Sequence, residues 1–179
     1  MARLFWLQFP IERAAAWFYY EPHGPVSDMI YDMKYRGRPD IAEALGAIVA
    51  QRFSSAGFFD GIDVLVPMPI TWRRQWQRGY NQSTMIARGI STVTQLPICT
   101  NAVKRTVFRQ SQTTRSGMER LHAVDDAFLL AHPDKIANRH ILIIDDIVTT
   151  GATITACARQ AAMAPGVRIS ILSLGLTKS

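Results

Sequence analysis

Short, nearly continuous apolar runs recur along the chain and are separated by segments of helical periodicity. They are rich in Val, Ile and Leu, which is typical of strands buried on both faces. Strands of this kind that alternate with helices indicate an α/β fold, a mainly parallel twisted sheet with helices on both faces. The predicted strands are IDVLVP (62–67), ICTNAV (98–103), AFLLA (127–131), HILIID (140–145) and VRISILSLG (167–175).

Apolar residues at spacings of three and four mark four predicted helices between these runs. A polar connection with two tryptophans follows the first strand, and residues 104–120 lack any periodicity and are expected to form a long loop. Proline ends the third helix at Pro97 and the fourth at Pro165. The predicted helices run from near Pro25 to Gly37, over 39–53, over 81–96 and over 153–164.

Length and composition agree with one globular unit of 179 residues, of which 48% are hydrophobic and 19% charged. The longest apolar runs fall short of the roughly 20 residues that span a bilayer, so membrane insertion is not expected. The apolar N-terminal stretch contains Gln8 and Pro10 and lacks a cleavage region, which argues against a secretory signal. With only two cysteines and no C-x-x-C pair, we expect a cytoplasmic protein without zinc.

The net charge of +6 is concentrated in one part of the chain. Residues 64–118 contain no Asp or Glu, whereas they hold eight of the Arg and Lys residues. This region is either a solvated basic face or a surface for phosphate or nucleic acid. Arg73, Arg74 and Trp76 alternate cations with an aromatic ring, a pattern that can follow single-stranded DNA through charge and stacking.

The stretch ILIIDDIVTTGATI (141–154) combines a predicted strand, two adjacent acids and a turn rich in Thr and Gly. In parallel sheets, ligands bind beyond the carboxyl ends of the strands. The amides at the start of the next helix suit a phosphate, and Gly151 permits close approach of the backbone. Asp145 and Asp146 suit vicinal ribose hydroxyls, with or without a divalent cation. The pattern therefore indicates a ribose 5-phosphate ligand.

Other uses of an acid pair at a strand end fit less well. The acids alone could cap the following helix. A receiver domain needs a further acid at the end of its first strand, where this chain has only Asp63 at the strand's start. A Walker B strand needs a preceding G-x-x-x-x-G-K-[ST] motif, which the chain lacks. The Thr-Thr-Gly-x-Thr turn favours phosphate binding over capping.

This stretch resembles the phosphoribosyl pyrophosphate (PRPP) motif of type I phosphoribosyltransferases. Further segments are similar to one branch, the ComF/GntX-like competence protein family, and extend the resemblance from about residue 19 onward. The similar segments are MKYRGRPDIAEALG (33–46), LVPMPITWRRQWQRGYNQSTMIAR (65–88), KRTVFRQSQTTRSGMER (104–120) and DDAFLL (125–130). The resemblance implies a type I phosphoribosyltransferase-like core at 61–179 and a small N-terminal hood at 1–60.

The resemblance also implies roles for individual residues. Asp145 and Asp146 would hold the ribose, and Mg²⁺ would bind through PRPP beside them rather than to the protein directly. The pyrophosphate loop would comprise Pro67 and Met68, with Arg78 of the RGYNQ signature facing the anion. Loop 104–120 would close over the substrate, and Lys104, Arg105 and Arg109 would stabilise the departing pyrophosphate. The motif residues expected to bind PRPP are Asp145, Asp146, Ile147, Val148, Thr149, Thr150, Gly151, Ala152 and Thr153.

Two hypotheses of different class follow. The first is a phosphoribosyltransferase, a pentosyl-transferring glycosyltransferase that displaces pyrophosphate from Mg-PRPP onto an acceptor. The second is a non-enzymatic, PRPP- or nucleotide-responsive component of DNA uptake or utilisation that binds single-stranded DNA. A homodimer is compatible with either hypothesis.

The chain departs from the family pattern in several places. It has no cysteine before Cys99, where the branch carries zinc-ligating pairs, and Ala123 stands where asparagine is common. Because the chain ends four residues after Gly175, we expect the hood over the site to come from residues 1–60.

Overall fold

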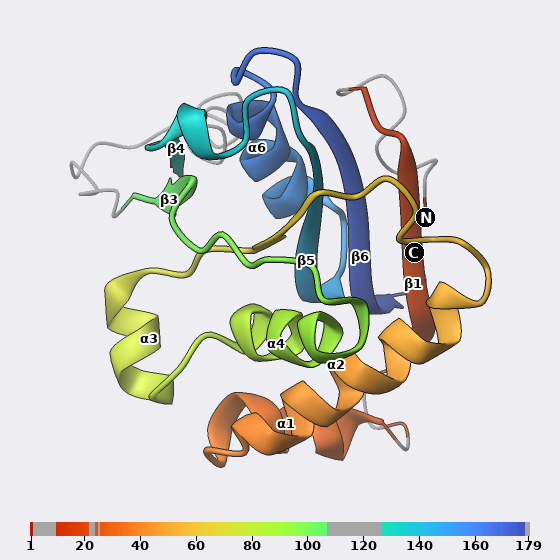
Figure 1. Ribbon diagram of the computed structural model, residues 1–179. Helices are drawn as coiled ribbons and strands as arrows, with labels where there is room; N and C mark the ends of the chain where they lie inside the picture. The colour runs from red at the N-terminus through yellow and green to blue at the C-terminus, as the bar shows by residue number, and fades with distance from the viewer. Residues whose placement is uncertain (2–9, 22–23, 25, 107–126, 178–179) are drawn as a thin grey trace.

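The computed structural model contains a main sheet of four parallel strands (Figure 1). The structure describes residue 1 and residues 10–21, 24, 26–106 and 127–177. The strand order is β1-β6-β5-β2, and a separate antiparallel pair joins β3 to β4. The strands are β1 (Arg13–Tyr20), β2 (Val64–Pro67), β3 (Val103–Arg105), β4 (Phe128–Leu130), β5 (His140–Val148) and β6 (Arg168–Thr177).

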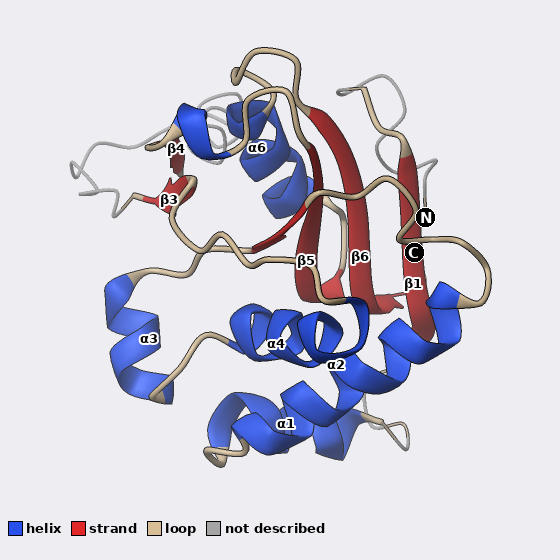
Figure 2. Ribbon diagram, in the orientation of Figure 1, coloured by secondary structure: helices blue, strands red, loops and turns tan. Residues whose placement is uncertain are grey.

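Helices cover both faces of the main sheet, which confirms the predicted α/β architecture (Figure 2). One face carries α6, and the other carries α2 and α4, with α1 packed against α2. None of the described helices has the length and apolar character needed to cross a bilayer. The helices are α1 (Ser27–Tyr35), α2 (Pro39–Ser54), α3 (Trp72–Arg78), α4 (Gln82–Thr94) and α6 (Ala152–Ala161), with a 3₁₀ turn η2 at Pro133–Lys135.

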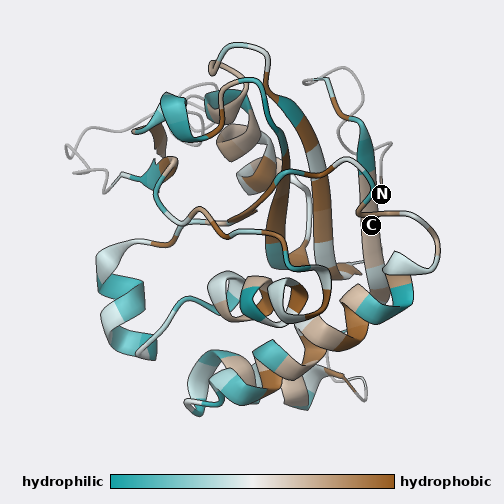
Figure 3. Cartoon of the chain, in the orientation of Figure 1, coloured by the Kyte–Doolittle hydropathy of each residue, from teal (hydrophilic) through white to brown (hydrophobic). Residues whose placement is uncertain are grey.

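Alternate residues of β5 feed two separate cores, which explains why this strand reads as a continuous apolar run. Ile141 and Ile143 pack with α6, whereas Leu142 and Ile144 pack with α2 and α4. Successive side chains of a strand point to opposite faces, so a strand covered on both sides is apolar at most of its positions. The central strands are accordingly among the most hydrophobic parts of the molecule, and α3 is among the most hydrophilic (Figure 3).

Several predicted boundaries were wrong. The strand predicted over 98–103 is reduced to a single bridge between Ile98 and Leu65, and β3 begins only at Val103. Lys104 and Arg105 consequently lie in a strand and not in a loop, whereas residues 107–126, including Arg109, lie outside the described residues. The polar connection after β2 contains the short helix α3. Strand β1 was not predicted, so the first 60 residues supply a sheet strand as well as two helices.

Helices α2 and α4 approach each other at two glycines. A β-carbon at Gly89 would overlap the carbonyl oxygen of Glu43 and would lie 2.7 Å from the backbone nitrogen of Ala47. A β-carbon at Gly46 would overlap the carbonyl oxygen of Ile86. The two helices therefore pack backbone against backbone, which holds the N-terminal helices firmly on the core.

His140 is a buried polar residue at the start of β5, with only 1% of its surface exposed. Its Nδ1 lies 3.0 Å from the carbonyl oxygen of Gly61, and its Nε2 lies 2.8 Å from Oγ of Ser170. A carbonyl can only accept, so Nδ1 carries the proton in the neutral ring and Nε2 accepts from the serine hydroxyl. Burial and the nearby Arg168 lower the pKa of His140.

We expect stability to fall in acid because of His140. A pKa that is lower in the folded state favours the neutral ring, so this contribution is complete above the unfolded-state pKa of about 6.5. It is lost as the pH falls through the lower folded-state value. Urea unfolding at a series of pH values from 7.5 to 5 should show this loss in wild type and in His132→Gln, but not in His140→Gln. An unchanged slope in His140→Gln would contradict the assignment.

Candidate functional site

The acid pair lies where two neighbouring strands part. Strand β2 pairs with β5 only up to Pro67, which stands opposite Ile144, and the chain then leaves the sheet. Strand β5 continues to Val148, so Asp145 and Asp146 lie within the strand and not just after it, as the sequence pattern had suggested. Helix α4 packs on one face of the sheet and α6 on the other. Connections that leave to opposite faces open a crevice at the sheet edge, where α/β folds bind ligands.

The turn after β5 presents backbone amides to this crevice. Gly151 has φ of 78° and precedes the first residue of α6, with no side chain capping the helix. The positive φ favours glycine at this position. Oγ1 of Thr150 accepts from the backbone nitrogen of Ala152 at 3.4 Å. The first amides of a helix have no acceptor within it and lie at the positive end of the helix dipole, so this turn suits an anion.

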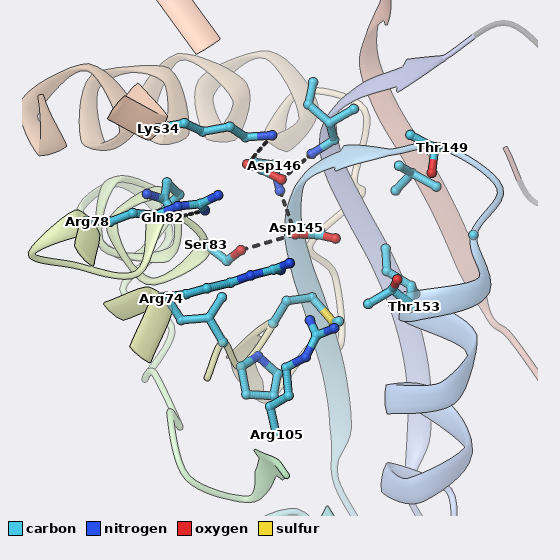
Figure 4. Close-up of a pocket in the computed structure, with 17 residues that line it drawn as sticks. Lys34, Arg74, Arg78, Gln82, Ser83, Arg105, Asp145, Asp146, Thr149 and Thr153 are labelled. Atoms are coloured by element: carbon cyan, nitrogen blue, oxygen red, sulfur yellow. Dashed lines mark hydrogen bonds and ion pairs between the residues drawn. The ribbon is translucent and has the colours of Figure 1, made fainter. Parts of the chain in front are cut away.

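Asp145 is partly buried and is held from one side only. Its Oδ1 accepts from Oγ of Ser83 at 3.2 Å and from the backbone nitrogen of Asp146 at 2.9 Å. Its Oδ2 accepts no hydrogen bond from the described residues and points into open space (Figure 4). Burial, followed by the adjacent carboxylate of Asp146, raises the pKa of Asp145 to about 8. A hydroxyl donor or a cation at Oδ2 would relieve this cost.

Asp146 is paired with a residue of the hood. Nζ of Lys34, at the end of α1, lies 3.0 Å from Oδ2 of Asp146, and both side chains are largely shielded from solvent. The other oxygen, Oδ1, accepts from the backbone nitrogen of Ile147 at 2.7 Å. Lys34 therefore offsets the charge of the acid pair and ties helix α1 to the carboxyl end of β5.

Two arginines face the acid pair and the threonine turn. Arg74 and Arg105 reach into the space from the side opposite Thr149 and Thr153 (Figure 4). Burial, followed by the like charge of Arg74, lowers the pKa of Arg105, although a guanidinium stays protonated. Arg105 also lies over the ring of Phe128, 5.2 Å from its centroid. The two guanidinium groups repel each other, and an anion bound between them would relieve this repulsion.

These groups line one cavity of about 300 Å³, which we call the acid-pair cavity. It holds the cations of Lys34, Arg74, Arg78 and Arg105 against the two acids, so its lining is positive overall. Of the residues predicted to bind PRPP, Thr150 and Ala152 are not in the lining, and neither are Pro67 and Lys104. The lining comprises Lys34, Met68, Pro69, Ile70, Arg74, Arg78, Gln82, Ser83, Arg105, Asp145, Asp146, Ile147, Val148, Thr149, Gly151, Thr153 and Ile154.

The RGYNQ segment fixes the walls of this cavity. Asn81 caps helix α4 by accepting from the backbone nitrogen of Ser83, and it donates to the carbonyl oxygen of Met68 at 2.9 Å. The hydroxyl of Tyr80 and Nε2 of Gln82 both donate to the carbonyl oxygen of Met33 at the end of α1. The segment thus positions both the turn after β2 and the hood.

Arg78 completes the same wall. Its guanidinium donates to Oε1 of Gln82 at 2.8 Å and lies 5.6 Å from the centroid of the Tyr35 ring. It joins α3 to α1 and also lines the acid-pair cavity.

The lining residues that were not assigned to the PRPP site from the sequence include Lys34, Ser83 and Arg74. Lys34 and Ser83 stand in helices that look like ordinary packing elements, and only the fold brings them to Asp146 and Asp145. Arg74 was grouped with Arg73 and Trp76 as a nucleic-acid contact, but its side chain enters the acid-pair cavity. Arg73 and Trp76 are exposed on α3 and do not line this cavity.

The fold is that of the type I phosphoribosyltransferases. A glutamine PRPP amidotransferase from Bacillus subtilis, solved with ADP and GMP, aligns with a TM-score of 0.53 at 17% identity over 79% of this chain and 30% of its own. A structure described as the allosteric regulatory enzyme of purine biosynthesis aligns with a TM-score of 0.52 at 15% identity over 79% of this chain and 29% of its own. At these identities the likeness concerns the fold alone.

Sequence relatives are more specific than the structural ones, and they carry the names of DNA utilization and competence proteins. DNA utilization protein YhgH of Escherichia coli K12 is 33% identical over 138 residues, which cover 75% of this chain and 60% of the relative. Competence protein ComFC of Bacillus subtilis is 27% identical over 146 residues, 82% of this chain and 57% of the relative. The chain thus spans about 60% of the length of these curated relatives. No family model matches the chain.

Proposed function

We propose that the chain binds Mg-PRPP in the acid-pair cavity and transfers its phosphoribosyl group, with release of pyrophosphate, to an acceptor. The observation that supports this most directly is the arrangement of Asp145 and Asp146 between a phosphate-binding turn and a group of cations, all in one cavity. PRPP has a phosphate at one end, ribose hydroxyls in its middle and a pyrophosphate at the other end. The cavity offers matching groups in the same order.

Each part of the cavity has a counterpart on the ligand. The amides and hydroxyls of turn 149–153 receive the 5-phosphate, and Asp145 and Asp146 accept from the ribose hydroxyls. The turn after β2 and the guanidiniums of Arg74 and Arg105 receive the pyrophosphate. Guanidinium groups suit phosphate oxygens because their donors form a planar fork.

The residues present also suit Mg²⁺ held through PRPP. A hard cation prefers oxygen ligands, and Mg²⁺ commonly binds through one or two carboxylates together with substrate phosphates. Oδ2 of Asp145 is open to the cavity and can accept such a cation. When bound, the cation would neutralise charge on the pyrophosphate. Arg105 and Arg74 of the chain itself would stabilise that group as it leaves C1, at the point where negative charge grows.

Replacing both Lys104 and Arg105 by Ala should slow turnover strongly and change PRPP binding little. Arg105 contributes to the departing anion, and the loss of one such donor slows a reaction by about 100-fold or more. PRPP affinity should change far less because the 5-phosphate and ribose contacts remain. Pyrophosphate release with a panel of acceptors measures turnover, and calorimetry measures binding. Lys135→Ala, on the remote η2 turn, is the control; equal loss of binding and turnover would remove the assigned role.

A second candidate function is single-stranded DNA binding at α3. The names of the relatives, DNA utilization protein and competence protein, favour it. Helix α3 carries three arginines and no acid, and Trp76 is 81% exposed. This function needs no turnover and is compatible with PRPP as an effector.

Replacing Arg73 and Arg74 by Ala tests the DNA hypothesis. The removal of each arginine–phosphate interaction should weaken binding and reduce the slope of affinity against salt by about one. Anisotropy of a labelled oligonucleotide at several salt concentrations measures both quantities. If the double variant binds as wild type does at every salt concentration, α3 is excluded as the contact surface.

A further inference from the structure

A second groove lies beside the acid-pair cavity and shares a wall with it. The common wall consists of Pro69, Ile70 and Arg105. The groove encloses about 640 Å³ between α3, α4 and β3, and we call it the side groove. This volume lies within the range of sites that bind small molecules, about 300–1,000 Å³.

The lining of the side groove is basic. Arg88 of α4 and Lys104 and Arg105 of β3 contribute cations, and none of the described Asp or Glu residues lines it. Arg88 and Lys104 are exposed, so both can reach a ligand. A concave surface that carries these three cations attracts an anion. The guanidinium groups of Arg88 and Arg105 suit the oxygens of a phosphate. Lys104, expected from the sequence to act on pyrophosphate, faces this groove and not the acid-pair cavity.

One wall of the groove is an exposed indole. Trp72 is 72% exposed although it borders the groove, so most of its ring is uncovered. An exposed aromatic ring beside cations can stack on a nucleobase. Such stacking tolerates any of the bases because each base has a flat π-face. Trp76 stands four residues further on the same helix, is 81% exposed and does not line the groove. The two tryptophans therefore form a natural pair for comparison.

We propose that the side groove binds a nucleoside phosphate, with its base against Trp72 and its phosphate at Arg88 and Lys104. This site is separate from the proposed PRPP site, and Arg105 connects the two. The proposal concerns a second ligand and stands whether or not PRPP binds in the acid-pair cavity.

The probe must be one that the acid-pair cavity does not suit. 2′-Deoxyadenosine 3′-monophosphate lacks both a 5′-phosphate and vicinal hydroxyls, so it cannot place a phosphate at turn 149–153 and ribose hydroxyls at the acid pair at the same time. We expect saturable quenching of tryptophan fluorescence by this nucleotide and binding heat in calorimetry. Inorganic phosphate, which lacks the base, should bind at least about tenfold more weakly.

Matched variants locate the site. Trp72→Leu should abolish the quenching and weaken binding by calorimetry about tenfold, while Trp76→Leu should keep the affinity. Arg88→Gln should weaken binding about tenfold, whereas Arg139→Gln, a cation outside the groove, should not. The Asp145→Asn/Asp146→Asn variant should bind the probe as wild type does, and this separates failure here from failure of the PRPP site.

Three results would overturn the proposal: no saturable binding, equal effects of Trp72→Leu and Trp76→Leu, or loss of binding in the double Asn variant. A free nucleotide and the 3′-phosphorylated end of a DNA strand (a chain end) both present a base beside a phosphate. A deoxyadenosine trinucleotide with a 3′-phosphate distinguishes them, because tighter binding that still depends on Arg88 indicates a chain end, and equal affinity indicates the free nucleotide.

Discussion

Wild type should bind PRPP only with Mg²⁺, and Asp145→Asn/Asp146→Asn should lose this binding. Asn keeps the size of Asp, and its oxygen can still accept from Ser83, so the cavity keeps its shape. What disappears is the charge that the ribose hydroxyls and the cation need. A hydrogen bond to a charged group contributes about 1.5–3 kcal/mol, so two such losses should reduce the affinity by about 100-fold or more. Calorimetry with and without Mg²⁺ measures this directly.

The control for this experiment is Asp134→Asn on the exposed η2 turn, which should bind as wild type does. PRPP binding of equal strength in the double variant would exclude the acid pair as the ribose site. Absence of PRPP binding to folded wild type would contradict the proposed PRPP site and would favour the nucleic-acid hypothesis.

The single substitution Asp145→Asn should alter how the stability of the unliganded protein depends on pH. The pKa of Asp145 is raised to about 8, above its unfolded value of 3.8. The neutral acid is therefore favoured in the folded state, and this stability is fully present below the unfolded pKa and is lost as the pH rises through the folded pKa. Urea unfolding between pH 4 and 8 should show a loss in wild type that Asp145→Asn lacks.

The second large effect is expected at the crossing of α2 and α4, where Gly89→Ala should destabilise the protein by about 2 kcal/mol. Alanine gains about 1 kcal/mol of helix propensity over glycine. Against this, overpacking costs about 1–3 kcal/mol and can exceed it. The higher cost applies here because the new methyl group meets backbone atoms of Glu43 and Ala47, which no change of rotamer can move away.

Urea unfolding at neutral pH measures this change. Val93→Ala, at an exposed position of the same helix, should alter the free energy of unfolding by no more than about 0.5 kcal/mol. If Gly89→Ala were more stable than wild type, α2 and α4 would have to separate without cost, contrary to their close approach.

The central part of the fold could be predicted from the sequence because β2, β5 and β6 are apolar at most of their positions. Strand β1 escaped prediction because the run RAAAWFYY is an edge strand that reads as neither alternating nor uniformly aliphatic. Helix α3 escaped because WRRQWQR buries no residue and so carries no amphipathic pattern. Its helical state depends on local signals, with Thr71 as N-cap and Gly79 in the left-handed conformation after its last turn.

The contiguous part of the candidate site could be predicted from the sequence pattern, whereas Met68, Arg78 and Arg105 could be predicted only through the family resemblance. Residues 145–153 are contiguous, so their residue types and spacing alone predict a site for ribose and phosphate. Lys34, Ser83 and Arg74 lie far from it along the chain, and their side chains meet it only through the crossing of helices over the sheet edge. Lys104 and Arg105 are neighbours in β3, yet only Arg105 reaches the acid-pair cavity, a divergence that the sequence does not reveal.

The ion pair between Lys34 and Asp146 changes what a measured affinity would mean. Adjacent carboxylates without a ligand repel each other, and here an ammonium group of the hood already offsets part of that repulsion. If a magnesium-bound sugar phosphate binds here as we propose, its association would be an exchange of counter-charges, because the ligand would displace or redirect Lys34. The measured binding energy would then be a difference between two compensated states, and Lys34, once released from Asp146, would be available to the incoming anion.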